Sequence, residues 1–286
     1  MTKPLIEGKT KLLTLLPDRP GYARVQSKDD ITAGDGARRA LMKGKARLAN
    51  ATTCHVFKAL QEFGIPLAFV EQDGDSFITK VVEMIPVEIV VRNVATGSYC
   101  KRWPDVPDST RFEHPVMEFF YKTNNQQFRG HHLGCDDPLM QFTDDGTRLA
   151  FHRPNMPVNH ELPLLEMDMA TMEMKERRML HSQLTLCGTL ARNVNDALSK
   201  LWRAAGGDLI DFKIECGFVA DDTNAEFMVA DVIDCDSWRV IRQGEQLSKQ
   251  PFRDGMTAAD LLPTYKKARD LTRQFPSLAR RIVHAR

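Results

Sequence analysis

The sequence has no excess of charge of one sign and no long apolar run. Its 286 residues carry 39 Lys and Arg against 38 Asp and Glu, which leaves a formal net charge of +1. A chain so nearly balanced has no overall field that would gather nucleic acid or an anionic membrane. We therefore expect neither as a partner, and we expect any bound anion to be held by a few local side chains.

Motifs built on cysteine are also lacking. The six cysteines include no C-x-x-C pair, which argues against a zinc ribbon or a thiol-redox motif and favours free, buried thiols. The first residues, MTKPLIEGKTK, contain no apolar signal region, and no apolar run is long enough to span a bilayer. Together these absences predict a cytoplasmic protein.

The pattern over residues 5–92 predicts strands interrupted by one helix. Apolar residues recur at helical spacing over residues 56–63, and Gly64 followed by Pro66 closes that helix. Short apolar runs on either side of Asp73-Gly74 predict a hairpin. We therefore expect a β-rich region with one helix packed on it.

The rest of the chain is predicted to be a loop-rich stretch followed by helices. Residues 123–163 are rich in Asn, Asp, His, Gly and Pro, with weak periodicity, and are interpreted as a loop-rich stretch. An apolar stripe from Leu180 to Trp202 predicts one long helix, ended by Gly206-Gly207. A second helix is expected within residues 257–274.

An alternating pattern after this long helix indicates a strand with one charged face. Apolar residues at 210, 212, 214 and 216 alternate with Asp211, Lys213 and Glu215. A second strand at residues 227–232 follows the polar turn at residues 221–224, so a hairpin can bring Asp231 near the charged face. Glu215 and Asp231 would form a Mg²⁺ site beside a nucleotide, and the alternative is a solvated sheet face.

Three further patterns favour anion binding, each with an ordinary alternative. Lys9 and Lys11 share one face of a probable strand beside Gly8, although this is not a Walker A motif and surface lysines are common. The small-residue loop at residues 32–38 has amides that can hold an anion, or it is a plain turn. Arg92 and Ser98 suit a phosphate monoester, unless Arg92 is a surface residue paired with Glu88.

A metal site around His131 and His132 is not expected. Cys135, Asp136 and Asp137 follow these histidines closely. Adjacent histidines rarely converge on one ion, and no second paired cluster completes a tetrahedral site.

These motifs occur in the order found in one enzyme family, and the sequence resembles SAICAR synthetase from about residue 5 to about residue 254. The Val232–Arg239 stretch, VIDCDSWR, is most similar to the synthetase half of the animal bifunctional purine enzyme. The similar blocks are Glu7 to Lys11, Ser27 to Gly34, Pro86 to Asn93 with Gly97-Ser98, Asp137-Pro138, Asp211 to Gly217, and Asp231 to Arg239.

The resemblance implies a two-lobed α+β fold with ATP in the cleft. The expected domains are a β-rich nucleotide-binding lobe at residues 1–84 and an α+β lobe at residues 85–286, which binds substrate and metal and ends in a helix. It also implies the ATP-dependent ligation of L-aspartate to carboxyaminoimidazole ribotide through an acyl phosphate, giving SAICAR, ADP and phosphate in purine biosynthesis. Mg²⁺ is the implied metal, and a homo-oligomer is one alternative for the assembly.

The resemblance also implies a role for each matched residue. Lys213 and Asp211 are implied at the catalytic centre, where Asp211, Lys213 and Asp236 lie near the ribotide's ring, ribose or reacting carboxylate. The binding residues are Lys9 and Lys11 for the ATP phosphates, Glu83 and Met84 for the adenine, Glu215 and Asp231 for Mg²⁺, Arg92, Ser98 and Arg239 for the ribotide phosphate, and Asp137 as a further lining residue.

The sequence departs from the family pattern at two places. Lys122 is followed by a longer insert at residues 123–136 in place of an acidic run, and Cys216 replaces a usual aromatic residue. The insert leaves the contacts of that loop open. The remaining alternatives are a kinase or ligase acting on another phosphorylated metabolite and an inactive nucleotide-binding protein. ADP release with the ribotide, with and without aspartate, separates them.

Overall fold

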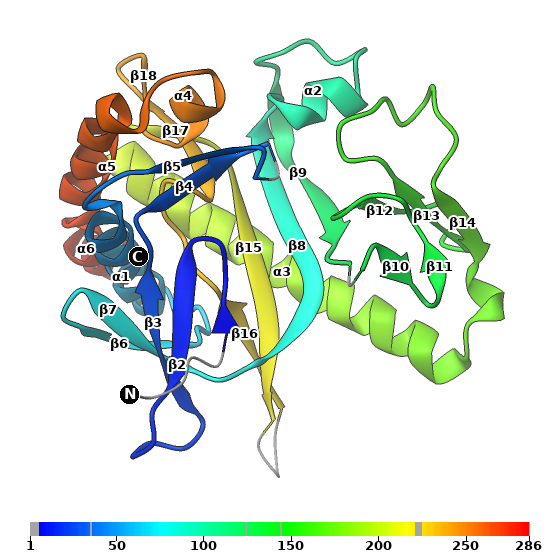
Figure 1. Cartoon of the computed structure of the whole chain (residues 1–286), viewed down its shortest axis with the longest axis horizontal. Coiled ribbons are helices and arrows are strands. Elements are labelled where there is room, and N and C mark those ends of the chain that lie inside the picture. Colours follow the sequence, from blue (N-terminus) through cyan, green and yellow to red (C-terminus); the bar gives the residue numbers. More distant parts are fainter. Residues whose placement is uncertain (1–5, 35, 124, 144, 221–224, 286) are drawn as a thin grey trace. The chain divides into compact units, whose positions relative to one another are not determined.

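The computed structural model describes residues 6–34, 36–123, 125–143, 145–220 and 225–285, and it confirms an α+β fold (Figure 1). The chain divides into two compact units. Unit 1 contains the residues up to Glu83, Asn193–Leu209, and Gly217 onward, and unit 2 contains Met84–Arg192 and Ile210–Cys216.

Unit 1 begins with a five-stranded sheet. Neighbouring strands pair antiparallel. The β6–β7 pair confirms the predicted hairpin at Asp73-Gly74. Alternate residues of β3 are buried, so one face of the sheet forms core. In order, the strands are β1 (Ile6–Glu7), β2 (Lys11–Leu15), β3 (Tyr22–Ser27), β7 (Ser76–Lys80) and β6 (Phe69–Asp73). A separate pair is formed by β4 (Asp30–Ala33) and β5 (Arg38–Leu41).

The helices of unit 1 pack together around α1 (Lys45–Glu62). The helix ends as predicted, with Phe63 at its C-cap and Gly64 at a φ of 73°. Phe57 of α1 packs on Phe77 of the sheet, with ring centroids 6.2 Å apart. Figure 1 shows α5 (Ala258–Thr272) and α6 (Phe275–His284) beside α1, and the helix predicted within residues 257–274 is confirmed as α5. The short helix α4 (Gln250–Arg253) precedes them and packs on α5.

Unit 2 contains one end of a larger sheet. The strands at this end run in the order β14-β13-β12-β9-β8-β15. From β14 to β8, each strand pairs antiparallel with the next strand in this order. A short helix, α2 (Ser98–Arg102), connects β8 to β9, and η1 (Met169–Thr171) follows β14. The strands are β8 (Glu83–Val94), β9 (Arg111–Tyr121), β12 (Leu139–Phe142), β13 (Arg148–His152) and β14 (Leu165–Asp168).

The stretch at residues 123–163, predicted to be loop-rich, also contains short strands that the sequence pattern did not indicate. This stretch contains β10 (Gln127–Phe128), β11 (His131–His132), β12 and β13. None of these strands exceeds five residues, so each is too short to show a clear alternation. Their pairing across the sheet, rather than local periodicity, makes them strands.

Two elements cross from one unit to the other. The predicted long helix is confirmed as α3 (Met174–Ala204), although it begins earlier than the apolar stripe, and β15 (Asp208–Ala220) follows it. The predicted pairing of the next strand, β16 (Ala225–Ala230), with β15 is also confirmed. The turn predicted at residues 221–224 lies outside the described residues. The order continues from β15 to β17 (Trp238–Arg242) and β18 (Glu245–Gln246).

The compact units differ from the two continuous lobes that the resemblance implied, at residues 1–84 and 85–286. The first division falls after Glu83, but α5, α6 and β16 to β18 belong to unit 1 with the N-terminal strands. The physical cause is packing, because α1 of the N-terminal residues lies against α5 and α6, with Arg280 Nη1 of α6 donating to Glu62 Oε1 of α1 at 3.0 Å. No helix within the described residues combines the length and apolar character needed to cross a membrane.

Candidate functional site

The charged face of β15 carries a network of ion pairs within unit 2. Lys213 Nζ lies 2.7 Å from Glu88 Oε2, and Lys122 Nζ lies 2.7 Å from Glu215 Oε1. Glu88 comes from β8 and Lys122 follows β9. One partner stands on β8 and the other directly after β9, so the face is an organised set of opposite charges rather than a row of independently solvated groups.

Asp137 adds a carboxyl group that is harder to ionise than usual. Burial raises the pKa of Asp137, and Glu88 and Asp136 act in the same direction, against Lys122 and Lys213. The residue also has a φ of 46°, which is in the left-handed region. Non-glycine residues seldom adopt this conformation, and those that do are concentrated at active sites and ligand-binding sites.

Lys122 is held in its charged form. Burial by itself would lower the pKa of Lys122, but Glu215, Glu88 and Asp137 outweigh it and raise the pKa. Sequence reasoning named Lys122 only as the start of the insert. Its position directly before the insert, at the end of an apolar strand, is the signal that could have identified it.

Arg92 is the centre of a second, buried network in unit 2. Its side chain is 3% exposed, so the alternative that Arg92 is a surface arginine is wrong. Its Nε donates to Glu118 Oε2 at 2.5 Å, Nη1 donates to Asp211 Oδ2 at 2.7 Å, and Nη2 donates to Ser98 Oγ at 3.3 Å. The structure thus brings together three of the predicted ribotide residues, Arg92, Ser98 and Asp211.

In unit 1, Lys11 and Asp231 form an ion pair. Asp231 follows β16 directly and has a φ of 64°, another left-handed non-glycine conformation. Lys9 approaches the predicted anion loop, since a Cβ on Gly36 would lie 3.9 Å from Lys9 Nζ. Asp35 of that loop lies outside the described residues.

Asp236 is engaged by two residues that sequence reasoning missed. Lys45, the first residue of α1, places its Nζ 2.8 Å from Asp236 Oδ2, and the Tyr265 hydroxyl of α5 donates to Oδ1. Burial by itself would raise the pKa of Asp236, but Lys45 and Lys249 outweigh it and lower the pKa. Both carboxylate oxygens therefore have protein partners, and direct contact of Asp236 with the ribotide stays a prediction.

Asp234, two residues before Asp236, has its pKa shifted in the opposite direction. Burial and the neighbouring charge of Asp236 raise the pKa of Asp234 to about 6. Asp234 Oδ1 also accepts a hydrogen bond from the Asp236 amide at 2.8 Å. The segment that leads to Arg239 is therefore fixed by buried contacts. Arg239 itself donates from Nε to Gln250 Oε1 at 3.0 Å.

The predicted adenine residues stand where the chain passes between the units. The division falls between Glu83 and Met84, and again between Cys216 and Gly217. Met84 is 40% exposed. A Cβ on Gly217 would lie 2.7 Å from the Glu83 carbonyl oxygen. Only glycine allows this close backbone approach.

The predicted site residues thus fall into two groups. Unit 2 contains Arg92, Ser98, Asp137, Asp211, Lys213 and Glu215, and unit 1 contains Lys9, Lys11, Asp231, Asp236 and Arg239. Within each unit the fold brings some of them into direct contact, as with Arg92 and Asp211 or Lys11 and Asp231. A joint site formed by both groups stays a prediction.

The carboxylates assigned to Mg²⁺ have a suitable chemical character. Carboxylate oxygen is the donor that Mg²⁺ prefers. Glu215 and Asp231 each face a lysine ammonium group, from Lys122 and Lys11 respectively. Each carboxylate thus has a lysine partner in this structure, and their joint binding of Mg²⁺ stays a prediction. His131 and His132 of β11 are exposed, and the expectation that they hold no metal stays a prediction.

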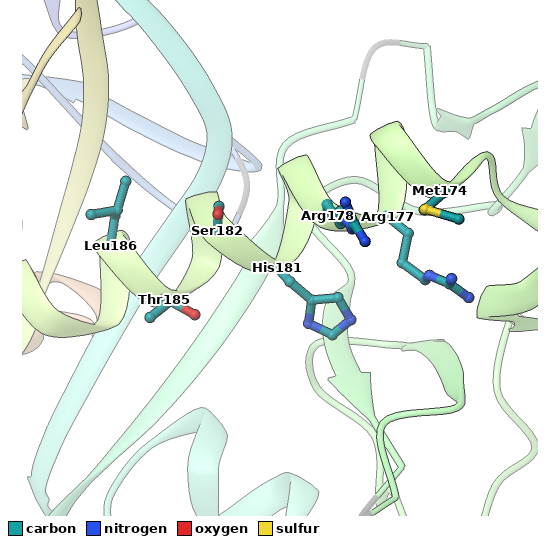
Figure 2. A pocket seen from close by; sticks show the side chains of 7 residues that line it. All are labelled: Met174, Arg177, Arg178, His181, Ser182, Thr185 and Leu186. Carbon is teal, nitrogen blue, oxygen red and sulfur yellow. The ribbon is translucent and has the colours of Figure 1, made fainter.

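A groove follows the first turns of α3 in unit 2. Figure 2 shows its lining side chains, which all come from this one helix. None of the predicted site residues lines this groove. The lining residues are Met174, Arg177, Arg178, His181, Ser182, Thr185 and Leu186.

Comparison with known families gives a match over most of the chain. The family described as SAICAR synthetase matches residues 4–130 and 163–269. The chain is 33% identical over 281 residues to phosphoribosylaminoimidazole-succinocarboxamide synthase from Herpetosiphon aurantiacus, covering 95% of this chain and 97% of that protein. The predicted resemblance to the animal bifunctional enzyme is also confirmed.

The animal relatives are longer proteins. The chain is 36% identical over 265 residues to the bifunctional phosphoribosylaminoimidazole carboxylase/phosphoribosylaminoimidazole succinocarboxamide synthetase of Drosophila melanogaster. This match covers 91% of the chain but 54% of the Drosophila protein. The chain thus spans about half the length of the animal relatives that it matches.

Solved structures agree with the fold. One is a SAICAR synthetase of type 2 in complex with ADP, with a TM-score of 0.70 and 26% identity, covering 94% of this chain and 97% of that one. Another, phosphoribosylaminoimidazole-succinocarboxamide synthase from Ehrlichia chaffeensis, has a TM-score of 0.72 and 24% identity, with coverage of 94% and 98%. The second likeness bears on the fold alone.

Proposed function

Since this chain belongs to the SAICAR synthetase family, we propose that it is an ATP-dependent ligase that joins L-aspartate to carboxyaminoimidazole ribotide. The products are SAICAR, ADP and phosphate, in purine biosynthesis. The observation that carries this proposal is the family match over residues 4–130 and 163–269, with matched charged residues present in each unit.

We assign the ribotide to the networks of unit 2. Arg92 and Ser98 would bind the phosphate, because a planar guanidinium and a neutral hydroxyl donor satisfy several oxygens at once. Arg239 of unit 1 would complete this clamp. Asp211, Lys213 and Asp137 would lie near the ring, the ribose or the reacting carboxylate, and Asp236 would support the same site. Lys213, whose Nζ lies 2.7 Å from Glu88 Oε2, would act at the catalytic centre, because an ammonium group can neutralise negative charge that develops in the transition state.

We assign the nucleotide to residues of unit 1 and to the passage between units. Lys9 and Lys11 would neutralise the ATP phosphates, and Glu83 with Met84 would border the adenine. The relative solved with ADP supports nucleotide use. Glu215 and Asp231 would hold Mg²⁺, which, when bound, neutralises charge on the phosphates.

The chemistry requires activation of a carboxylate, since its oxygen is a poor leaving group. The γ-phosphoryl group of ATP is transferred to a carboxylate oxygen of the ribotide, giving ADP and an acyl phosphate. The aspartate amine then attacks the acyl carbon, the C–O bond to phosphate breaks with its electron pair, and the amine loses a proton. The protein contributes positioning and charge neutralisation, so no nucleophilic side chain is required.

A coupled assay of ADP release tests this proposal. ADP release that requires both the carboxylated ribotide and aspartate is the expected result, with SAICAR identified by mass spectrometry. Release with the ribotide alone, or with another phosphorylated metabolite, would favour a kinase or a related ligase. ATP binding without any ADP release would favour an inactive nucleotide-binding protein.

We also propose a cytoplasmic location. All six cysteines are free thiols, which fits a reducing, cytoplasmic location. The partners are the small-molecule substrates. A homo-oligomer is compatible with this function, and sedimentation of the purified protein measures the assembly directly.

A further inference from the structure

Unit 2 contains a carboxylate that is shared by two buried arginines. Glu118 of β9 pairs in register with Val90 of β8, so its side chain lies on the same face as Arg92, two residues along β8. Glu118 Oε2 accepts from Arg92 Nε at 2.5 Å. Arg102, the last residue of α2, donates from Nε to Glu118 Oε1 at 2.9 Å and from Nη2 to both oxygens at 2.6 Å.

The three side chains are withdrawn from water. Arg102 is 0% exposed, Arg92 is 3% exposed and Glu118 is 4% exposed. Two guanidinium groups this close would repel each other strongly in a buried setting, so the carboxylate between them is needed. Asp211, at 2.7 Å from Arg92 Nη1, balances the remaining positive charge. Two cations and two anions thus form a neutral buried set.

The same contacts determine how Arg92 is oriented. Its Nε is bound to Glu118, and its two Nη atoms are directed at Asp211 and Ser98. A bond at Nε fixes the plane of the guanidinium group, because that group is rigid. Arg102 in turn fixes Glu118 through both carboxylate oxygens. The orientation of Arg92 therefore depends on Arg102 indirectly, through the carboxylate of Glu118.

We propose that Glu118 and Arg102 are positioning residues for phosphate recognition, with Glu118 fixing the guanidinium plane of Arg92 and Arg102 fixing Glu118. This inference rests on the proposed function, in which Arg92 and Ser98 bind the ribotide phosphate. Both side chains are buried, at 0% and 4% exposed, so we assign their effect to Arg92 and not to a substrate contact. A bidentate grip on phosphate requires the correct angle of the guanidinium plane as well as its charge.

The competing interpretation is that the pair only stabilises the fold. The two interpretations predict different substrate affinities for a variant that still folds. A structural pair can be replaced by apolar side chains of similar volume at little cost in stability, and substrate affinity would then be normal. A positioning pair cannot be replaced in this way, because Arg92 loses its anchor at Nε.

The test is the double variant Glu118→Met/Arg102→Met. It removes one negative and one positive charge together, so Arg92 keeps Asp211 as its counterion. We expect the KM for the ribotide to rise at least tenfold, while the KM for ATP stays within twofold of the wild-type value. A folded double variant with an unchanged ribotide KM overturns the proposal.

A second variant keeps the proposal testable if the double variant does not fold. Arg102→Lys retains the charge but cannot donate to both oxygens of Glu118 in the same way. It should raise the ribotide KM several-fold and leave the ATP KM unchanged. An unchanged ribotide KM in this variant also contradicts the proposal.

Two controls separate this inference from the wider assignment. The variant Arg148→Met/Glu166→Met removes an ion pair between β13 and β14 in the same unit, and it should leave both KM values unchanged. Arg92→Lys tests the phosphate assignment itself. If Arg92→Lys raises the ribotide KM and the Glu118/Arg102 variants do not, only the positioning role is wrong. If Arg92→Lys has no effect, the phosphate assignment of Arg92 is wrong and the positioning role falls with it.

Discussion

Lys45 Nζ lies 2.8 Å from Asp236 Oδ2, and the Lys45 side chain is only 1% exposed. Burial by itself would lower the pKa of Lys45, but Asp236 and Asp234 outweigh it and raise the pKa. A fully buried ammonium group is thus kept charged by the segment that leads to Arg239. Because a buried ion pair is costly to break from one side, this contact makes a clear prediction.

Replacing Lys45 with Met should destabilise the protein by about 3 kcal/mol, because Asp236 loses its main cationic partner while it stays buried. Urea unfolding measures the loss. The matched control is Lys267→Met, since Lys267 and Glu245 form an exposed ion pair, and it should cost less than about 1 kcal/mol. Equal losses in the two variants would contradict this account.

Gly217→Ala should destabilise the protein by roughly 1–3 kcal/mol, as overpacking does. The new Cβ would meet the Glu83 carbonyl oxygen at 2.7 Å and Val82 Cγ2 at 3.0 Å, so backbone must move. Thermal unfolding measures the effect. Gly188→Ala is the control, because its Cβ would meet nothing closer than 3.7 Å and alanine favours the helix. Destabilisation by Gly188→Ala alone would refute the argument.

Arg239→Lys should raise the KM for the ribotide about tenfold, because lysine keeps the charge but cannot grip phosphate with two parallel donors. The KM for ATP should change less than twofold, and initial-rate kinetics with each substrate varied in turn measure both. Arg242→Lys on the same strand, where Nε donates to the Ala205 carbonyl oxygen, is expected to leave both values unchanged. A shift in the ATP KM alone would mean that Arg239 is wrongly assigned.

Glu215→Gln and Asp231→Asn should each lower kcat by about a hundredfold at ordinary Mg²⁺ concentrations, because each removes a carboxylate charge assigned to the metal. Rates across a Mg²⁺ titration measure this loss, and circular dichroism checks the fold. Glu226→Gln on β16 is the control, since Glu226 pairs with Lys80 at 2.7 Å, and it should keep the wild-type rate. Wild-type rates in both site variants would refute the metal assignment.

His55 should make the unfolding free energy depend on pH in mildly acidic solution. Burial, with the nearby charges of Lys58, Arg269 and Arg273, lowers the pKa of His55 from 6.5 to about 4. The unfolded chain therefore binds this proton first as pH falls. The stabilising contribution is complete above pH 6.5 and is lost as pH falls towards 4.

Urea unfolding of His55→Gln measures this dependence. Between pH 7 and pH 5 this variant should lose roughly 1 kcal/mol less than the wild type, an amount that allows for solvent screening at a half-buried site. His160→Gln, at an exposed position, should leave the pH dependence as it is. Identical pH profiles for wild type and His55→Gln would exclude the effect.

The elements that could be predicted from sequence are those whose own pattern is long enough to be read. The stripe of α3 and the alternation of Asp211, Lys213 and Glu215 each repeat several times within one element, so burial on one side is evident locally. Gly64 and Asp73-Gly74 mark boundaries for conformational reasons that hold in any fold.

The features that escaped prediction depend on partners far away in the chain. Lys45 looks like an ordinary lysine at a helix start until Asp236 is placed against it. Arg102 and Glu118 likewise show no local signal of their shared burial, because lysine, arginine and glutamate are usually exposed. The short strands β10 and β11 escaped prediction for the same reason, since only their pairing makes them strands.

The division of the chain has a consequence for synthesis on the ribosome. Residues 84–192 cannot complete their sheet until residues 210–216 of β15 have emerged, and unit 1 also waits for α5 and α6. Vectorial folding, in which an N-terminal domain matures while the next is still being translated, is therefore unavailable to unit 1, whereas unit 2 has all of its residues once Cys216 has emerged. A stalled ribosome that has exposed residues up to Arg192 should carry a protease-sensitive nascent chain, and protease resistance should appear first in unit 2, after Cys216 has emerged, and in unit 1 only after α6 has emerged.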